Sequence, residues 1–167
     1  MFNPSSITLA DITSTSHPSE EYILSKDVYV PEYKSYSPNK AKLEEIRAWL
    51  DKNNENLQIR AFGAVWCKDC KEQLPRIAKI AKILNDPRFT VEILGSIKVK
   101  APYDRVEGET IWKSPPAPPE TNDTRFDMYH IPAIFIFNKD GRCLGKIDEK
   151  PEHTKTMETE VLHYLLK

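Results

Sequence analysis

The feature that most constrains the fold is a strand–helix–strand pattern between residues 57 and 93. Residues 57–64 begin with alternating apolar side chains and continue as an unbroken apolar run, which predicts an interior strand covered on both faces. Residues 67–84 carry apolar side chains at helical spacing, and Pro75 lies within that helix. Residues 89–93 alternate again as a second strand. A strand, a helix and a strand in this order predict a crossover unit whose two strands are parallel.

Two cysteines, Cys67 and Cys70, stand where the apolar run of the first strand gives way to this helix. A side chain at the start of a helix faces unpaired backbone N–H groups and the positive end of the helix dipole. The Cys67 thiol should therefore lose its proton more readily than an ordinary cysteine. Cys70 lies about one turn further along the same face, within reach of a disulfide bond to Cys67. The pattern indicates reversible thiol–disulfide exchange.

Composition argues against several classes of function. A chain of 167 residues is long enough for one domain with a substantial core, and a formal net charge of −1 gives no electrostatic reason to expect binding to nucleic acid or to a membrane. No run of about 18 apolar residues is present, and residues 1–6 lack the basic and apolar regions of a secretory signal. Three cysteines are too few for a disulfide-stapled secreted scaffold, so we expect a cytoplasmic protein.

The rest of the chain divides into an extension, an insertion and further regular elements. We expect residues 1–36 to be a partly mobile extension, with tyrosines that cover an edge of the domain and a segment, 27–31, that could add a short strand. The domain is expected over residues 37–167, beginning with a helix capped at Ser37. An irregular, proline-rich insertion interrupts it at about 98–122. After the insertion the pattern predicts a short helix at 123–129, an apolar strand at 133–137, a turn at 138–141, a return strand at 142–148 and a helix from about 154.

Together these features resemble the thioredoxin family over about residues 38–167. The matching motifs are Trp66-Cys67-x-x-Cys70, Pro75 within the helix, Ile131-Pro132 directly before an apolar strand, and the hairpin turn that ends in Gly141. The resemblance implies an α/β, thioredoxin-like fold with a central mixed sheet of four to five strands flanked by helices. It also implies a cis peptide bond at Ile131-Pro132, beside the two cysteines, and pairing of the Ile131 backbone with bound substrate.

Two departures from the family pattern bear on the chemistry. The pair between the cysteines is a lysine and an aspartate where ordinary thioredoxins have Gly-Pro. Many family members carry a buried acid six residues before the first cysteine and a lysine that partners it, whereas this chain has Ala61 and, in the next strand, Ile93. The resemblance therefore implies that the usual proton acceptor for the second cysteine is missing, and that its substitute is Asp69, Glu72 or water.

The sequence predicts a thiol–disulfide oxidoreductase that reduces protein disulfides. Cys67, favoured as a thiolate by the helix start and by Lys68, attacks the substrate disulfide, and Cys70 resolves the mixed disulfide. The expected partners are a disulfide-containing protein and an external reductant, and we expect a monomer. No cofactor is expected, because the chain has no glycine-rich phosphate loop. The residues expected to contact substrate are Trp66, Lys68, Asp69, Ile131 and Pro132.

Three other hypotheses remain open from the sequence. A thioredoxin-like domain without redox turnover could serve as a binding or adaptor module that holds a partner with the insertion at 98–122. A zinc site is a second alternative, with Cys67, Cys70, Cys143 and His130 as ligands, although only one Cys-x-x-Cys pair is present. The third is a purely structural disulfide between Cys67 and Cys70. For Cys143 itself we expect a small buried residue in the return strand.

Overall fold

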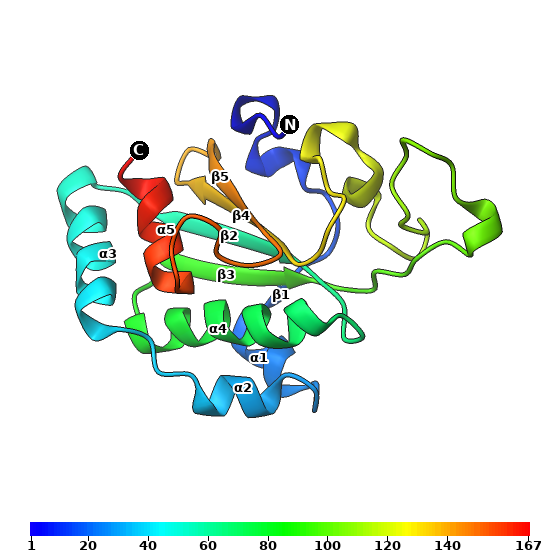
Figure 1. Cartoon of the computed structure of the whole chain (residues 1–167). Coiled ribbons are helices and arrows are strands. Elements are labelled where there is room, and N and C mark those ends of the chain that lie inside the picture. Colours follow the sequence, from blue (N-terminus) through cyan, green and yellow to red (C-terminus); the bar gives the residue numbers. More distant parts are fainter.

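The computed structural model describes all residues from 1 to 167 and has an α/β fold with a five-stranded mixed sheet flanked by helices (Figure 1). β2 and β3 are parallel, as the strand–helix–strand pattern predicts, and the other neighbouring pairs are antiparallel. The order across the sheet is β1-β3-β2-β4-β5. The strands are β1 (His17–Pro18), β2 (Leu57–Phe62), β3 (Phe89–Leu94), β4 (Ala133–Asn138) and β5 (Cys143–Asp148).

Helices α1, α2 and α4 lie on one side of the sheet, whereas the N-terminal turns and residues 119–126 lie on the other side (Figure 1). None of the helices combines the length and the apolar character that crossing a membrane would require. The helices are α1 (Ser19–Leu24), α2 (Val30–Ser35), α3 (Lys40–Asn53), α4 (Lys68–Leu84) and α5 (Met157–Leu165).

An aromatic cluster connects β2, β4 and the segment that follows the insertion. Phe135 of β4 packs edge-on against Phe62 of β2 and against Phe126, with ring centroids 5.8 and 5.4 Å apart. Phe2 adds a further ring, 5.7 Å from that of Phe135. Edge-on aromatic pairs stabilise a core beyond the area that they bury. Every residue of β4 is buried as well, and its first residue, Ala133, pairs with Phe62 at the end of β2.

α3 begins later than the sequence pattern predicted. Asn39 is its N-cap, because the Asn39 side chain accepts a hydrogen bond from a backbone N–H of the first turn. Ser37 therefore does not cap the helix, and the prediction of a start at that residue is wrong. The predicted apolar stripe is buried as expected, and its members are Leu43, Ile46 and Leu50.

Residues 1–36, for which we expect partial mobility, contribute buried side chains to the core of the domain. The segment 27–31 is not a strand: it is a turn followed by the start of α2. Pro31 lies in the first turn of α2, where a backbone N–H has no partner within the helix, so proline loses no hydrogen bond there. The edge strand is β1, in which His17 pairs with Ile93 of β3. The buried residues of the extension are Ile7, Ser19, Ile23, Tyr29 and Tyr33.

The insertion at 98–122 is irregular, as predicted, but its ends are anchored. Trp112 is buried, and its Nε1–H donates a hydrogen bond of 2.6 Å to a backbone carbonyl beyond the insertion. The carboxylate of Glu120, also buried, accepts hydrogen bonds from the backbone N–H groups of Thr13 and Ser14. The insertion and the extension therefore hold each other in place.

Candidate dithiol site

The two cysteines lie at the junction between β2 and α4. Cys67 is the N-cap of α4, and its sulfur accepts a hydrogen bond from the backbone N–H of Cys70, with an N···S distance of 3.3 Å. Between strand and helix the chain passes through Gly63, where a Cβ atom would lie only 3.1 Å from the Cys70 sulfur. The first turn of α4 can approach β2 this closely because the glycine has no side chain. The helix start that the sequence predicted is confirmed.

Cys67 carries the more acidic of the two thiols. A hydrogen bond from the Cys70 side chain is the main reason that the pKa of Cys67 falls to about 7; burial and the Asp69 carboxylate act in the opposite direction. Cys67 is 9% exposed and stands between two exposed side chains, Trp66 and Lys68. Although the Cys67 side chain is largely buried, a sulfur with a pKa near neutrality is partly thiolate, which is the nucleophilic form.

Cys70 is the opposite case. Its side chain is fully buried, and its sulfur accepts a hydrogen bond from the backbone N–H of Ala64 at 3.4 Å. Burial above all, and next its hydrogen bond to Cys67, raises the pKa of the Cys70 thiol. At neutral pH one sulfur is therefore partly ionised while its neighbour keeps its proton.

The Ile131-Pro132 segment lies directly beside this pair. The Ile131 carbonyl oxygen is 3.5 Å from the Cys67 sulfur, which donates to it when protonated. The Ile131–Pro132 peptide bond is cis, and both residues are buried. The Pro132 carbonyl accepts a hydrogen bond of 2.8 Å from the Glu149 N–H. The structure thus brings Cys67, Ile131 and Pro132 together, and the binding role of the last two stays a prediction.

The other three residues expected to contact substrate are neighbours of Cys67 in the chain. Trp66 is 51% exposed, and its Nε1–H donates a hydrogen bond of 3.0 Å to the Ile97 carbonyl, which fixes the ring beside the site. Lys68 is exposed and Asp69 is half-buried. Sequence reasoning did not single out Val65, which is 41% exposed and enlarges the apolar surface next to Trp66.

Sequence reasoning also missed two tyrosines of the extension. Tyr22 and Tyr29, expected to cover an edge of the domain, lie with their ring centroids 6.3 Å apart, and Tyr22 lines a pocket together with Ala64 and Trp66. Burial raises the pKa of each phenol, and a charge on Cys70 raises both further. Tyr29 is fully buried. Neither residue belongs to a periodic apolar pattern, so the sequence held no signal for this placement.

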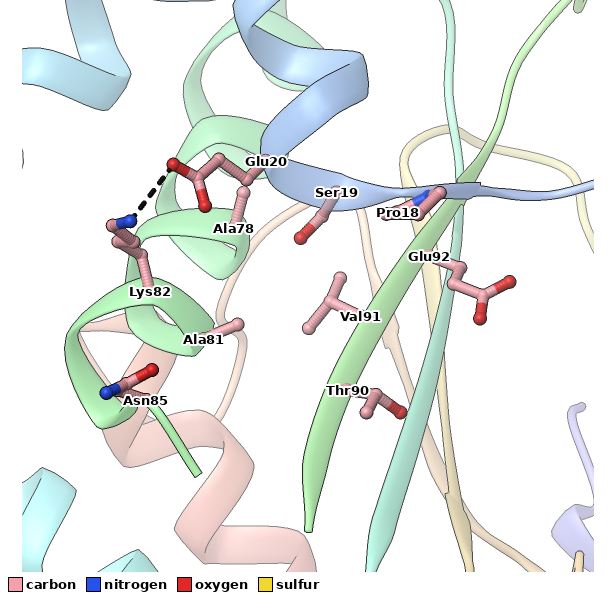
Figure 2. A pocket seen from close by; sticks show the side chains of 10 residues that line it. All are labelled: Pro18, Ser19, Glu20, Ala78, Ala81, Lys82, Asn85, Thr90, Val91 and Glu92. Atoms are coloured by element: carbon pink, nitrogen blue, oxygen red, sulfur yellow. Dashed lines mark ion pairs between the residues drawn. The ribbon is translucent and has the colours of Figure 1, made fainter. Parts of the chain in front are cut away.

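A pocket of about 250 Å³ lies beside Trp66. It is lined by Tyr22, Lys26, Ala64, Val65, Trp66, Ser96, Ile97 and Lys98. A second pocket, of about 380 Å³, lies between α1, β3 and the C-terminal half of α4, where Glu20 and Lys82 form an ion pair of 3.2 Å (Figure 2). None of the predicted site residues lines that second pocket.

No ionisable side chain occupies the interior positions where the resemblance would place an acid and a lysine. Ala61 of β2 and Ile93 of β3 are register partners, and both are fully buried. The carboxylate of Glu72 forms an ion pair of 3.3 Å with Arg76. The charge of Asp69 disfavours a thiolate on Cys70. Neither carboxylate is hydrogen-bonded to the Cys70 sulfur, so the structure identifies neither as its proton acceptor.

The zinc alternative has no site in this structure. No group of three or more His, Cys, Asp and Glu side chains is arranged to hold a metal ion. Cys143 lies in β5, where burial raises its pKa to about 11 and its thiol donates to the Gly145 carbonyl. The Nδ1 atom of His130 lies 2.9 Å from a carboxylate oxygen of Glu149. Cys143 is thus a buried strand residue, as expected.

No family model matches the sequence, and no curated protein matches it. Two solved structures share the fold: an HIV epitope-scaffold, and a protein of unknown function, PA1234, from Pseudomonas aeruginosa. Each has a TM-score of 0.58 and 13% sequence identity, over 96% of this chain and 88% of the other. At this identity the likeness concerns the fold alone. Because the alignment covers more of this chain than residues 37–167, the shared fold includes most of the extension.

Proposed function

We propose that this chain is a thiol–disulfide oxidoreductase with a thioredoxin-like fold that reduces protein disulfides. The observation that carries the proposal is the Cys67 sulfur at the N-cap of α4: its pKa is lowered to about 7, it lies between the exposed side chains of Trp66 and Lys68, and it is 3.5 Å from the Ile131 carbonyl. The parallel β2–α4–β3 unit and the position of the Ile131–Pro132 bond support the thioredoxin-like assignment.

The reaction has two steps. The Cys67 thiolate attacks one sulfur of the substrate disulfide, the substrate S–S bond breaks, and the first substrate thiolate leaves and takes up a proton. Cys70 then loses its proton and attacks the Cys67 sulfur, so that the Cys67–Cys70 disulfide forms and the second substrate thiol is released. The two protein thiols are oxidised to one disulfide while the substrate disulfide is reduced to two thiols. The pKa difference between the cysteines supports this order, because the more acidic sulfur attacks first.

The proposal has consequences for the conditions in which the protein works. An external reductant, either a reductase or a small thiol, must restore the dithiol after each turnover. A protein that reduces disulfides needs a reducing compartment, for which we propose the cytoplasm. The protein is proposed to act as a monomer and without a bound cofactor, since the two sulfurs carry both electrons.

Reduction of insulin by dithiothreitol, followed by turbidity, tests the proposal. The wild-type protein should accelerate the reaction and Cys67→Ser should abolish the acceleration, because the nucleophile is lost. Cys143→Ser is the matched control, since it removes a thiol outside the site, and it should retain activity. Cys70→Ser should accumulate a mixed disulfide between Cys67 and substrate, detectable by mass spectrometry. Full activity of Cys67→Ser would end the proposal.

A second candidate, a binding or adaptor module, is favoured by one observation. A groove of about 690 Å³ is lined by the proline run at 115–119 together with Ser14, Thr15, His17, Tyr22 and Lys26 of the extension. Pro115 and Pro116 are exposed, whereas Ala117 is buried, so the two prolines can be replaced by serine without opening the core. If the groove holds protein substrate, this double variant should raise KM for insulin and leave the reaction of Cys67 with a small disulfide unchanged. If the double variant no longer bound its protein partner but Cys67 still reacted with a small disulfide as in the wild type, the adaptor function would be favoured.

A further inference from the structure

The pocket of about 250 Å³ beside Trp66 carries positive charge and no negative charge. Its lining includes two lysines, Lys26 between α1 and α2 and Lys98 after β3, but no aspartate or glutamate. Neither of these lysines forms an ion pair. The lysines that do are Lys42, Lys82, Lys100 and Lys146. Two unpaired ammonium groups in a small hollow with apolar walls produce a concentrated positive potential, which attracts an anion.

The chain itself connects this pocket to the nucleophile. The lining includes Ala64, Val65 and Trp66, which directly precede Cys67. The Cys67 N–H donates a hydrogen bond of 3.2 Å to the Ala64 carbonyl, so this wall of the pocket turns directly into the start of α4. Since an extended chain spans about 3.3–3.6 Å per residue, a substrate residue a few positions from the attacked cysteine can reach the wall. The indole N–H of Trp66 is already used by the Ile97 carbonyl, which leaves the lysines to bind an anion.

Both lysines stand on backbone that is held by hydrogen bonds. The Lys98 carbonyl accepts a bond of 2.7 Å from the N–H of Lys113, in the insertion. The Lys26 N–H donates to the Ile23 carbonyl at 3.2 Å, and its Nζ atom lies 5.4 Å from the centroid of the Tyr22 ring. The pocket thus exists before any substrate arrives, and binding there need not order its backbone.

The size and the surroundings of the pocket favour a side chain of a polypeptide as its occupant. Sites for small molecules usually measure about 300–1,000 Å³, whereas this pocket has about 250 Å³. It adjoins the groove of about 690 Å³ along the proline run, because Tyr22, Lys26 and Ser96 line both. The groove also has no aspartate or glutamate in its lining. An extended polypeptide in the groove can therefore place an acidic side chain between the two lysines.

We propose that this pocket is a specificity site for an acidic side chain of the substrate, so that the protein prefers disulfides with a glutamate or aspartate close to the attacked cysteine. The inference rests on the proposed oxidoreductase function. The ammonium groups of Lys26 and Lys98 bind the carboxylate, and the exposed ring of Trp66 contacts the aliphatic part of the same side chain. These contacts orient the disulfide toward Cys67 before the first step and add no covalent step to the reaction.

The test compares two symmetrical peptide disulfides with blocked ends. They differ only near the cysteine, where one has glutamate and the other glutamine. Each reaction with reduced protein oxidises one Cys67–Cys70 dithiol and converts one peptide disulfide into two peptide thiols, which chromatography of acid-quenched samples measures. The ratio of the two rate constants is divided by the same ratio for dithiothreitol, which removes the intrinsic reactivity of the peptides. The glutamate peptide should react about fivefold faster at low salt, since each of two exposed ion pairs contributes a factor of about two. This preference should be lost at about 1 M salt.

Variants assign the preference to the pocket. Lys26→Met and Lys98→Met keep a long side chain without its charge; each should lower the preference about twofold, and the double variant should abolish it. Lys52→Met is the matched control and should retain the preference. Lys52 is an exposed lysine in the last turn of α3, which precedes the end of β2 opposite to the dithiol.

The outcomes separate this inference from the function on which it rests. A wild-type protein that releases no thiol from either peptide would overturn the proposed function itself. Equal corrected rates for the two peptides, or a preference that the double variant retains, would overturn the specificity site and leave the function standing. Glutathione disulfide is the probe for a small anionic disulfide. If its reduction depended on Lys26 and Lys98 while the two peptides reacted equally, the assignment of the pocket to an acidic polypeptide would be wrong.

Discussion

Replacing Cys70 with alanine should raise the pKa of Cys67, because the Cys70 thiol is the strongest influence that lowers it. Alanine removes the S–H donor and keeps the backbone N–H, which donates to the Cys67 sulfur at 3.3 Å. Cys70→Ser retains a side-chain donor in the same place. The two variants therefore separate the effect of the donor from the effect of losing the second sulfur.

The expected size of the change follows from the strength of one hydrogen bond. A hydrogen bond to a charged group contributes about 1.5–3 kcal/mol, and each pKa unit corresponds to about 1.4 kcal/mol, so the loss amounts to roughly one to two units. The Cys67 midpoint should move from about 7 to the ordinary thiol value of about 8.5 or slightly below it. At pH of about 7 the thiolate fraction then falls from about one half to about a tenth or less.

The assay is alkylation of the protein by iodoacetamide, followed by mass spectrometry over a range of pH. The midpoint of the rate profile is the quantity to compare, and a single rate at neutral pH is a poor substitute. A thiolate of higher pKa is more nucleophilic, by roughly threefold per pKa unit, which offsets much of the loss in thiolate fraction. Cys143→Ala is the matched control, since Cys143 is a buried cysteine away from the site. A Cys70→Ala midpoint that stays at about 7 would refute the assignment of Cys70 as the donor.

Two further predictions concern stability. Gly63→Ala should destabilise the protein by about 1–3 kcal/mol, since its Cβ would lie 2.5 Å from Leu74 Cδ1 and 3.1 Å from the Cys70 sulfur; an unchanged urea midpoint would contradict the close packing. Glu160→Gln should also destabilise the protein at neutral pH. Although burial opposes it, hydrogen bonds from His153 and from backbone N–H groups lower the pKa of Glu160. A lowered folded-state pKa means that this stabilisation is present above the unfolded value and is lost as the pH falls through the folded one. The difference in the free energy of unfolding between wild type and Glu160→Gln, measured by urea denaturation, should therefore be smaller at acidic pH than at neutral pH. An equal difference at both pH values would contradict this role of the Glu160 carboxylate.

The centre of the sheet and the position of the dithiol could be predicted because their signals are local. β2 and β4 are apolar along most of their length, and such a run is enough to predict a strand that is covered on both faces. The parallel pairing of β2 with β3 follows from the helix between them and from the handedness of crossovers. The position of Cys67 at the start of α4 could be predicted because the spacing of apolar residues changes there from that of a strand to that of a helix. Burial of Ile131 and Pro132 beside it depended on the family resemblance.

The extension could not be predicted, because its structure is imposed by its neighbours. β1 has two residues, too few for a period, and it is a strand only because β3 offers a free edge to His17 and Pro18. Val28 and Val30 alternate like a strand, yet Pro31 suits the first turn of α2 and this segment packs along α4. Tertiary contact prevailed over local preference here, as it does wherever the intrinsic signal is weak.

The interior of the sheet offers no acid beneath the second cysteine. With Ala61 and Ile93 filling the interior positions, the sheet supplies no titratable group to the Cys70 sulfur. The groups that influence this sulfur come from elsewhere: they are Cys67, the Ala64 amide and Asp69, and of these only the amide favours a thiolate on Cys70. Because no carboxylate is hydrogen-bonded to the Cys70 sulfur, resolution should follow the ionisation of Cys70 alone, and its pH profile should show a single ascending limb. A second ionisation in that profile would mean that an internal base takes the proton.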